Sequence, residues 1–537
     1  MKRIARGRHG LAIATVALSV MVSACASSSS SDDDATTEPA ERGRYEFGLV
    51  GDQADGEPVS GGTLTFADYA EARSLNPTQT YATGSSGGDA LAAVYDVLMR
   101  YNSETGEHDP WVAESLESND AFTVWTLQLR DGVEFSDGTP LDADAVVASI
   151  NYFMENRGSD TALLAPNVKS MKTTDASTVV FTMNSPWAQF PSMLAQGAGM
   201  ILAPAAYAGA EFKPIGAGPF TLDSYAPAEE MVLKANPSYW KGAPHLDAVR
   251  FIWPLTDDAK LDALNDASAD VAYLRNPVTV DTALEEDHVG ELQLTSFGNI
   301  VSINNAEGRP GFDVRVRKAI ALALDPAVDF QRAYEGKGLP GNELFPAESR
   351  WASDVEPLAI DEAEAKKLLD EAKADGYDGK ISYMDGTDPT SRAESVATKA
   401  LLERVGFKVD IDGVASIADQ IQKIYVDRDF DLARGAASVS ESDPFQRLQT
   451  NYSSTSLANA LGYANPDMDA ALVELQGAGT DEAVQTALDK VQTIWNETIP
   501  SVVVGANATF IAHQDDVHGL VSTSEQMMLL GEAWKSQ

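Results

Sequence analysis

Residues 129–140 of this 537-residue chain read Leu129-Arg130-Asp131-Gly132-Val133-Glu134-Phe135-Ser136-Asp137-Gly138-Thr139-Pro140. Two glycine-containing turns, at 130–132 and 136–140, divide the stretch. Apolar and polar side chains alternate over residues 122–129 before it, which predicts a strand. After it, Asp142 stands where the N-cap of a helix would be, and that helix has an apolar face at Val146, Val147, Ile150 and Phe153. A strand, two turns and a helix in close succession favour a mixed α/β architecture.

The same succession recurs in the second half of the chain. Asp361 and Glu364 have the spacing of a capping box at the start of a helix. A predicted helix over 396–405 is followed by an alternating strand over 407–411, and residues 501–505 form a short, strongly apolar run typical of a buried strand. Helices and buried strands that alternate in this way indicate an α/β fold.

Composition and charge exclude several classes of protein. The chain carries 39 Lys plus Arg against 81 Asp plus Glu, a formal net charge of -42. A surface of that sign repels nucleic-acid phosphates, so we expect no nucleic-acid partner. The hydrophobic share of 44% is that of a globular protein, and the length suffices for about three domains or lobes. A single cysteine excludes an intramolecular disulfide and a cysteine-built metal site.

The N-terminus has the features of a secretory signal that ends in a lipid attachment site. Residues 1–24 combine a basic head with an apolar run over 11–24, which is short for a membrane span. Cys25 follows small residues, as in the bacterial lipobox, so we expect cleavage before Cys25 and attachment of a lipid to its thiol. Loss of the four basic residues of the signal would change the net charge from -42 to -46. The polar, acidic segment 25–57 predicts a flexible tether to a soluble body outside the cytoplasmic membrane.

One motif suggests an enzyme. Residues 84–88 match the G-x-S-x-G pattern, with Ser86 at the position of the nucleophile in serine hydrolases. A helix is predicted over 90–99, as that motif requires, but the preceding residues 75–80 form a turn rather than a strand. A secreted serine hydrolase that uses Ser86 is therefore the alternative function.

Two further motif matches lack the neighbouring elements or the spacing that their functions require. Residues 336–341 match G-x-G-x-x-G but follow a helix and contain Pro340, so we expect a loop and no dinucleotide site. His513 and His518 are five residues apart, a spacing that does not place two imidazoles on one helical face. We therefore expect no bound metal and no cofactor.

Seven segments together resemble the extracytoplasmic solute-binding proteins of peptide-class ABC importers, bacterial family 5. The strongest is the 129–140 stretch itself. The others are Gly61–Thr65 with Ser74–Pro77, Val94–Leu98, Pro110–Leu116, Ile215–Phe220, Asn236–Trp240 and Val314–Ala319. They occur in the family's order from Gly61 to about Asp469, and a lipobox precedes them.

The resemblance implies a class II periplasmic-binding-protein-like fold of the peptide-binder type, with two α/β lobes joined by a hinge. We expect lobe I over 58–298 with an inserted subdomain at about 106–215, lobe II over 299–505, and a return to lobe I over 506–537. Such proteins enclose a peptide or another small solute between the lobes and pass it to the permease subunits of the importer. We expect the chain to be a monomer. A ligand sensor of the same fold that does not transport is an alternative function.

The family's peptide-binding segment corresponds to residues 431–444. The usual tryptophan position is Ala437 and the usual amine-binding aspartate position is Ser440, with Glu441 beside it. A serine lacks the charge that an ammonium group prefers, so the amine clamp is weakened. Arg434 would bind a ligand carboxylate or form a structural ion pair. The predicted binding residues of this segment are Arg434, Ser438, Val439, Ser440, Glu441 and Asp443.

A second group of predicted ligand contacts lies in the first lobe. Tyr81, Thr83, Ser85 and Ser86 precede a helix N-terminus, where hydrogen-bond donors converge. The family often uses this loop to contact ligands, which would also explain its richness in glycine and serine.

Overall fold

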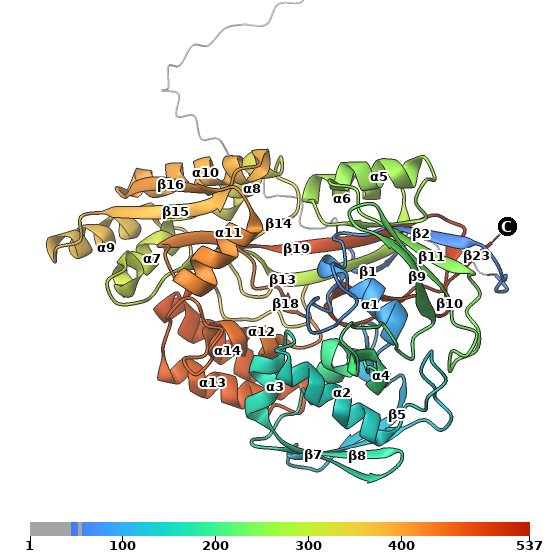
Figure 1. Ribbon diagram of the computed structural model, residues 1–537. Helices are drawn as coiled ribbons and strands as arrows, with labels where there is room; N and C mark the ends of the chain where they lie inside the picture. Colours follow the sequence, from blue (N-terminus) through green and yellow to red (C-terminus); the bar gives the residue numbers. More distant parts are fainter. Residues whose placement is uncertain (1–44, 52–55, 537) are drawn as a thin grey trace, which may run out of the picture. The chain divides into compact units, whose positions relative to one another are not determined.

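The structure is a computed structural model that describes residues 45–51 and 56–536. One mixed sheet runs through this part of the chain (Figure 1). Its strands lie in the order β16 (Lys408–Val414), β15 (Lys380–Gly386), β17 (Leu432–Gly435), β13 (Val289–Ile303), β19 (Ser501–His513), β12 (Val271–Leu274), β2 (Thr63–Ala67), β11 (Ala248–Ile252), β10 (Glu230–Ala235) and β9 (Phe220–Ala226).

Two long strands, β13 and β19, pair antiparallel in the middle of this sheet and connect its two halves. β19 is longer than the predicted strand at 501–505, and the predicted lobe boundaries at 298/299 and 505/506 fall inside β13 and β19. Their register shifts between Thr295 and Ile300, where Phe297 has a φ of 53°. The bulge turns the fully buried Phe297 ring against Phe345 and Trp495, at centroid distances of 5.8 and 5.4 Å.

The first half of the sheet combines parallel and antiparallel pairs. β2 is parallel to β11 and to β12, whereas β9, β10 and β11 form an antiparallel meander. The helices α5 (Asp257–Asn265) and α6 (Pro277–Glu285) contact β12 and β19, and α1 (Gly88–Tyr95) contacts β9. α1 is buried along its whole length, as expected of a helix of Ala, Leu, Val and Tyr enclosed on several sides.

The second half of the sheet is a parallel unit. β15 is parallel to both β16 and β17, and the connection from β15 to β16 is the helix α10 (Pro389–Val405). Helices α7 (Val314–Ala323), α8 (Pro326–Ala333) and α9 (Glu362–Ala374) pack around α10. Asp361 Oδ1 accepts the backbone N–H of Glu364 at 2.9 Å, so the predicted cap at the start of α9 is confirmed.

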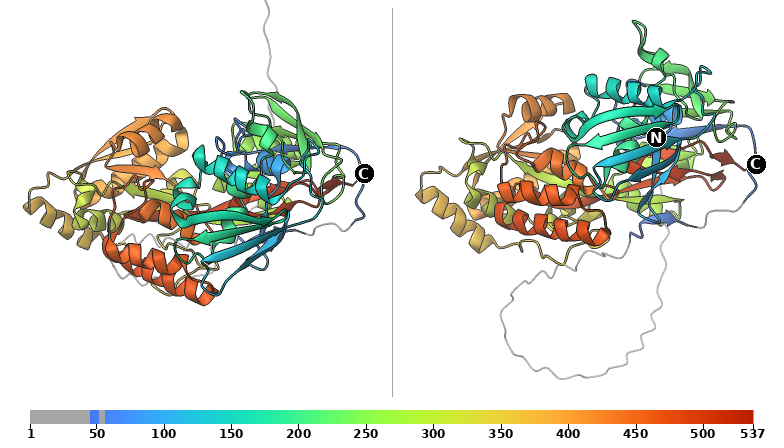
Figure 2. Two further views of the ribbon diagram at one scale, coloured as in Figure 1. Left: turned by 60° about the horizontal axis from the view of Figure 1, so that its bottom comes forward. Right: turned by 90° about the horizontal axis from the view of Figure 1, so that it is seen from below.

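A separate antiparallel sheet precedes the two turns of residues 130–140. Its order is β5 (Ala113–Ser118), β6 (Val124–Leu129), β8 (Thr178–Met183) and β7 (Val168–Asp175). Figure 2 shows this sheet in blue-green. β6 ends at Leu129, the two turns follow, and α2 (Ala143–Glu155) begins after Asp142, whose side chain accepts the N–H of Ala145 at 2.9 Å. The strand, turns and capped helix predicted around residues 129–140 are therefore confirmed.

The remaining elements are short or lie at the edges of these units. The helices are α3 (Thr161–Asn167), α4 (Pro204–Tyr207), α11 (Ile417–Ile421), α12 (Pro444–Tyr452), α13 (Pro466–Gln476) and α14 (Asp481–Thr498). The strands are β1 (Gly48–Val50), β3 (Met99–Asn102), β4 (Glu107–Pro110), β14 (Leu339–Pro340), β18 (Val439–Ser440), β20 (Val517–His518), β21 (Val521–Ser522), β22 (Met528–Leu529) and β23 (Trp534–Lys535).

Several predicted boundaries differ from the structure for local reasons. The predicted helix 90–99 ends at Tyr95, because Asp96 takes a φ of 58° and its carboxylate accepts the hydroxyl of Tyr239 at 2.7 Å. The predicted helix 396–405 begins at Pro389, since Asp388 caps it. Residues 336–341 contain the two-residue strand β14, which pairs with β19.

The expected N-terminal tether also has a structured portion. β1 lies within the segment 25–57 and pairs with β13, and Phe47 and Val50 pack against the core. The predicted signal 1–24 and Cys25 lie outside the described residues. Among the residues that are described, no helix combines the length and apolar character needed to cross a bilayer.

Candidate functional site

The candidate functional site is a cavity of about 640 Å³, called the large cavity below. Its walls come from segments far apart in the sequence: residues 47–49, 100–104, 291–294, 348, 350, 440, 441 and 520–526. Volumes of about 300–1,000 Å³ are typical of pockets for small organic ligands. The large cavity is therefore the right size for a small solute or a short peptide.

Two of the predicted binding residues, Ser440 and Glu441, lie in the wall of the large cavity. Ser440 belongs to β18, which pairs with β13, and its hydroxyl lies 2.8 Å from that of Ser442. The carboxylate of Glu441 accepts the hydroxyl of Ser349 at 2.8 Å and the backbone N–H of Arg350 at 3.0 Å. Burial raises the pKa of Glu441, whereas these donors act in the opposite direction.

The arginines of the cavity wall were not identified from the sequence. Arg350 donates to the carbonyl of Gly106 at 3.0 Å and to Asp481 at 2.6 Å, and its guanidinium lies 4.5 Å from the centre of the Trp351 ring. Arg100 donates to Asp109 at 3.2 Å. Arg350 contacts residues of distant segments, whereas Arg100 pairs with Asp109 across the hairpin of β3 and β4, and neither contact follows from a motif in the sequence.

A smaller cavity of about 150 Å³ lies beside the first part of the predicted binding segment. Its walls include Arg434 to Ala437 together with residues of α11 and α12. The side chain of Ala437, at the position of the family's tryptophan, is buried in this wall. The large and small cavities thus touch the two ends of one segment, 434–441.

Arg434 has its own set of buried partners. Its Nη1 lies 3.0 Å from Asp329 Oδ2, and its Nη2 lies 2.7 Å from Glu394 Oε1. A third bond, of 3.2 Å, joins Nη2 to Asn299 Oδ1. The structure therefore shows the ion pair, one of the two roles considered for Arg434. Burial raises the pKa of Glu394 to about 7, although the positive charge of Arg434 lowers it.

The remaining predicted residues of the segment have structural contacts. Ser438 takes a φ of 52°, and its N–H donates to the carbonyl of Phe297 at 3.3 Å. Val439 is fully buried in β18. Asp443 caps α12 and accepts the hydroxyl of Ser192 at 2.5 Å, and burial raises its pKa to about 7.

The loop with Tyr81, Thr83, Ser85 and Ser86 does not contribute to the wall of the large cavity, but it adjoins that wall. Gly84 lies so close to Gln526, a residue of the wall, that a Cβ atom there would be 2.1 Å from the Gln526 carbonyl oxygen. Thr83 and Ser85 hydroxyls are 3.3 Å apart, and the Tyr81 side chain is half exposed. A substitution in the loop would therefore reach the cavity through Gln526.

The Ser86 region lacks the geometry of a nucleophile elbow. Residues 84–86 form a single 3₁₀ turn, and no strand precedes it within residues 68–83. In the described chain, the Ser86 hydroxyl has no histidine as a hydrogen-bond partner; His513, for example, bonds to the Gln514 carbonyl. The strand and base that activate a serine are thus not assembled here.

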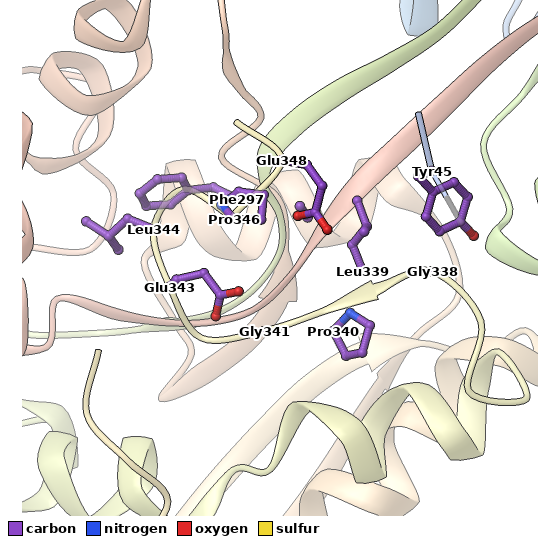
Figure 3. A pocket seen from close by; sticks show the side chains of 11 residues that line it. Tyr45, Phe297, Gly338, Leu339, Pro340, Gly341, Glu343, Leu344, Pro346 and Glu348 are labelled. Atoms are coloured by element: carbon purple, nitrogen blue, oxygen red, sulfur yellow. The ribbon is translucent and has the colours of Figure 1, made fainter. Parts of the chain in front are cut away.

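Two other candidate sites are small or occupied by protein. The pocket in Figure 3, between β14 and Phe297, has a volume of about 20 Å³, room for a single water molecule. His518 stacks on Trp534 with ring centres 4.1 Å apart. Among the described residues, no group of three or more His, Cys, Asp or Glu side chains could hold a metal ion.

Contacts between distant segments enclose the region around both cavities. Arg447 of α12 forms a 3.0 Å ion pair with Glu525 of the C-terminal segment. Gln446 donates to Asp160 at 2.7 Å, and the amide of Gln196 donates to Gln446 at 2.9 Å. α12 is therefore fastened both to the C-terminal segment and to the unit that contains the four-stranded sheet.

Comparison with known proteins points to one family. A sequence model described as "Bacterial extracellular solute-binding proteins, family 5 Middle" matches residues 107–459. The glutathione-binding protein GsiB of Shigella dysenteriae is 28% identical over 424 residues, which cover 73% of this chain and 80% of that protein. Protein XP55 of Streptomyces lividans is 24% identical over 494 residues, which cover 88% of this chain and 87% of that protein.

Solved structures show the same fold. The periplasmic binding protein DppA of Helicobacter pylori, in complex with the peptide STSA, has a TM-score of 0.75 at 21% identity and covers 89% of this chain and 99% of its own. NikA of Brucella suis, in complex with Fe(III)-EDTA, has a TM-score of 0.73 at 23% identity and covers 88% and 100%. The predicted two-lobe α/β fold of periplasmic binding proteins is confirmed.

Proposed function

The chain belongs to the bacterial extracellular solute-binding proteins of family 5, and we propose that it captures a peptide or peptide-like solute in the large cavity for delivery to an ABC importer. The protein is a solute-binding protein that works outside the cytoplasm. The likeness to GsiB and to the peptide-bound DppA supports a peptide-like solute.

The observation that carries the proposal is the composition of the large cavity. Residues 100–104 and 520–526 come from the predicted lobe I, and residues 348, 350, 440 and 441 come from the predicted lobe II. A solute in this cavity touches both lobes and therefore favours the arrangement in which they are closed. The closed form is the one that we expect the permease to recognise.

Ser440 and Glu441 are the proposed contacts for the amino group of the solute. Both line the large cavity, and the Glu441 carboxylate is held by Ser349 and Arg350. A charge-assisted bond from an ammonium group to Glu441 would replace part of the clamp that Ser440 cannot supply. In contrast, the guanidinium of Arg434 already has two carboxylate partners, so we assign it to the support of the segment.

Native mass spectrometry of the mature protein tests the function. We expect a co-purified compound of peptide size, which Glu441→Gln weakens. The matched control is Glu371→Gln on the exposed face of α9. A co-purified solute whose occupancy is unchanged by Glu441→Gln would contradict this placement. The absence of any bound solute, together with labelling of Ser86 by a fluorophosphonate, would favour a hydrolase instead.

Attachment to the membrane through Cys25 is part of the proposal. The small residues before Cys25 and the polar segment after it support a lipid anchor, and a monomer is sufficient for the binding mechanism. The described body would then be held near the permease by its N-terminal segment.

A further inference from the structure

The wall of the large cavity carries an excess of acidic side chains. Its ionisable lining consists of five glutamates and two arginines: Glu104, Glu291, Glu348, Glu441, Glu525, Arg100 and Arg350. The significance of this excess depends on which of these charges are already paired with protein groups.

Three of these charged side chains form ion pairs with residues that do not line the cavity. Arg100 pairs with Asp109 at 3.2 Å, and Arg350 pairs with Asp481 at 2.6 Å. Glu525 pairs with Arg447 at 3.0 Å. Because none of the three partners lines the cavity, the charge of both arginines is partly compensated from outside the wall.

The other four glutamates form no direct ion pair. In the described part of the chain, no lysine or arginine nitrogen lies within 4.0 Å of a carboxylate oxygen of Glu104, Glu291, Glu348 or Glu441, although the charge of Arg100 lowers the pKa of Glu291 and that of Arg350 lowers the pKa of Glu441. The wall therefore presents four carboxylates from four separate segments against two arginines that already pair with aspartates.

Burial makes part of this negative charge unfavourable. Glu291 is 8% exposed, and its neutral neighbours include the Ser103 hydroxyl, which lies 3.5 Å from its carboxylate. Burial raises the pKa of Glu291 and of Glu441. Ser524, also in the wall, is 1% exposed, and its hydroxyl has no hydrogen-bond partner. A positively charged hydrogen-bond donor in the cavity would supply what these groups lack.

We propose that the solute is an organic cation, namely a short peptide or peptide-like compound that bears a lysine- or arginine-type group besides its amino group. The carboxylates are spread over the wall, and in the described chain no three acidic or histidine side chains converge on one metal position. Charges spaced along a flexible molecule match that distribution better than a single ion. This assignment rests on the proposed function, because it names the solute of the same cavity.

The test compares tripeptides that differ in one side chain. Binding of Ala-Lys-Ala, Ala-Ala-Ala and Ala-Glu-Ala to the mature protein is measured by calorimetry, with spermidine as a cation that lacks peptide bonds. We expect Ala-Lys-Ala to bind about tenfold more tightly than Ala-Glu-Ala, and the difference to shrink at high salt. Tighter binding of spermidine than of every tripeptide would overturn the peptide-like nature of the solute.

Charge-neutralising variants show which glutamates cause the preference for a cationic side chain. Glu291→Gln and Glu348→Gln should each reduce the preference for Ala-Lys-Ala by about threefold or more, whereas the exposed Glu371→Gln should leave it unchanged. Glu348 is half-buried, so Glu348→Gln keeps the test valid should Glu291→Gln fail to fold.

The outcomes separate this inference from the proposed function. Equal or tighter binding of Ala-Glu-Ala overturns the cationic solute while leaving a solute receptor intact. An unchanged preference in both cavity variants also overturns it. Failure of all four probes to bind, in a protein that also carries no co-purified solute, overturns the proposed function together with the inference.

Discussion

Replacement of Arg434 by methionine should destabilise the protein strongly. The Arg434, Asp329 and Glu394 side chains are only 8%, 3% and 5% exposed, and the two ion-pair distances are 3.0 and 2.7 Å. Arg434→Met keeps the length and apolar stem of the side chain but leaves two buried carboxylates without a cation. Breaking a buried pair in this way costs about 3–5 kcal/mol, because the remaining charge is neither solvated nor paired.

The loss of stability caused by Arg434→Met should increase with pH. Arg434 lowers the pKa of Glu394, which burial nevertheless raises to about 7. Without the guanidinium, Glu394 takes up a proton more readily in the folded state than in the unfolded state. A folded pKa above the unfolded value gives stability at low pH that is lost as the pH rises through the folded pKa. The cost of Arg434→Met should therefore be largest at pH 8 and about 1–2 kcal/mol smaller at pH 5.5.

Urea unfolding followed by tryptophan fluorescence measures both quantities. The control is Arg404→Met, since Arg404 pairs with Glu362 on the surface at 2.8 Å and side-chain exposures of 53% and 47%. This control should cost no more than about 1 kcal/mol at either pH. A cost for Arg434→Met no larger than that of the control would refute the structural role. If solute binding were lost as well, Arg434 would have to be reassigned to a ligand carboxylate.

Three further predictions concern the binding segment and the N-terminus. Ser440→Asp should tighten binding of free-amino peptides by about tenfold, because a charge-assisted bond adds about 1.5–3 kcal/mol; calorimetry that shows no change would remove Ser440 from the amine site. Asp443→Asn should reduce by about 1–2 kcal/mol the loss of unfolding free energy between pH 5 and 8. The pKa of Asp443 is raised to about 7, so the folded protein holds this proton at pH 5 and loses it as the pH rises, and the substitution removes that titration. Equal changes of unfolding free energy with pH for both proteins in urea unfolding would count against it. Cys25→Ser should move the mature protein from the detergent phase to the aqueous phase on phase separation, and retention in detergent would contradict the lipid anchor.

Local sequence accounts well for the elements that local interactions stabilise. The stretch 129–140 specifies its turns through Gly132 and Gly138, which take φ values of 78° and 81°, and Asp142 specifies the start of α2. In contrast, the end of α1 at Tyr95 depends on Asp96, whose carboxylate is bonded by Tyr239 from a segment more than 100 residues away. Neighbouring residues carry no information about such a contact.

The same distinction between local and tertiary interactions applies to the candidate binding site. The order of short motifs was sufficient to identify the family and the two-lobe fold. The family resemblance also predicts the binding segment 431–444, in which Ser440 and Glu441 line the large cavity. The tertiary structure decided that Arg434 pairs with Asp329 and Glu394, and that the loop at 81–86 lies behind Gln526. It also decided the charge of the large cavity, since its five glutamates come from five segments and its arginines pair with aspartates outside the wall. Electrostatic compensation depends on distance in space, so the net charge of -42, known from the sequence, could not reveal which carboxylates lack a partner.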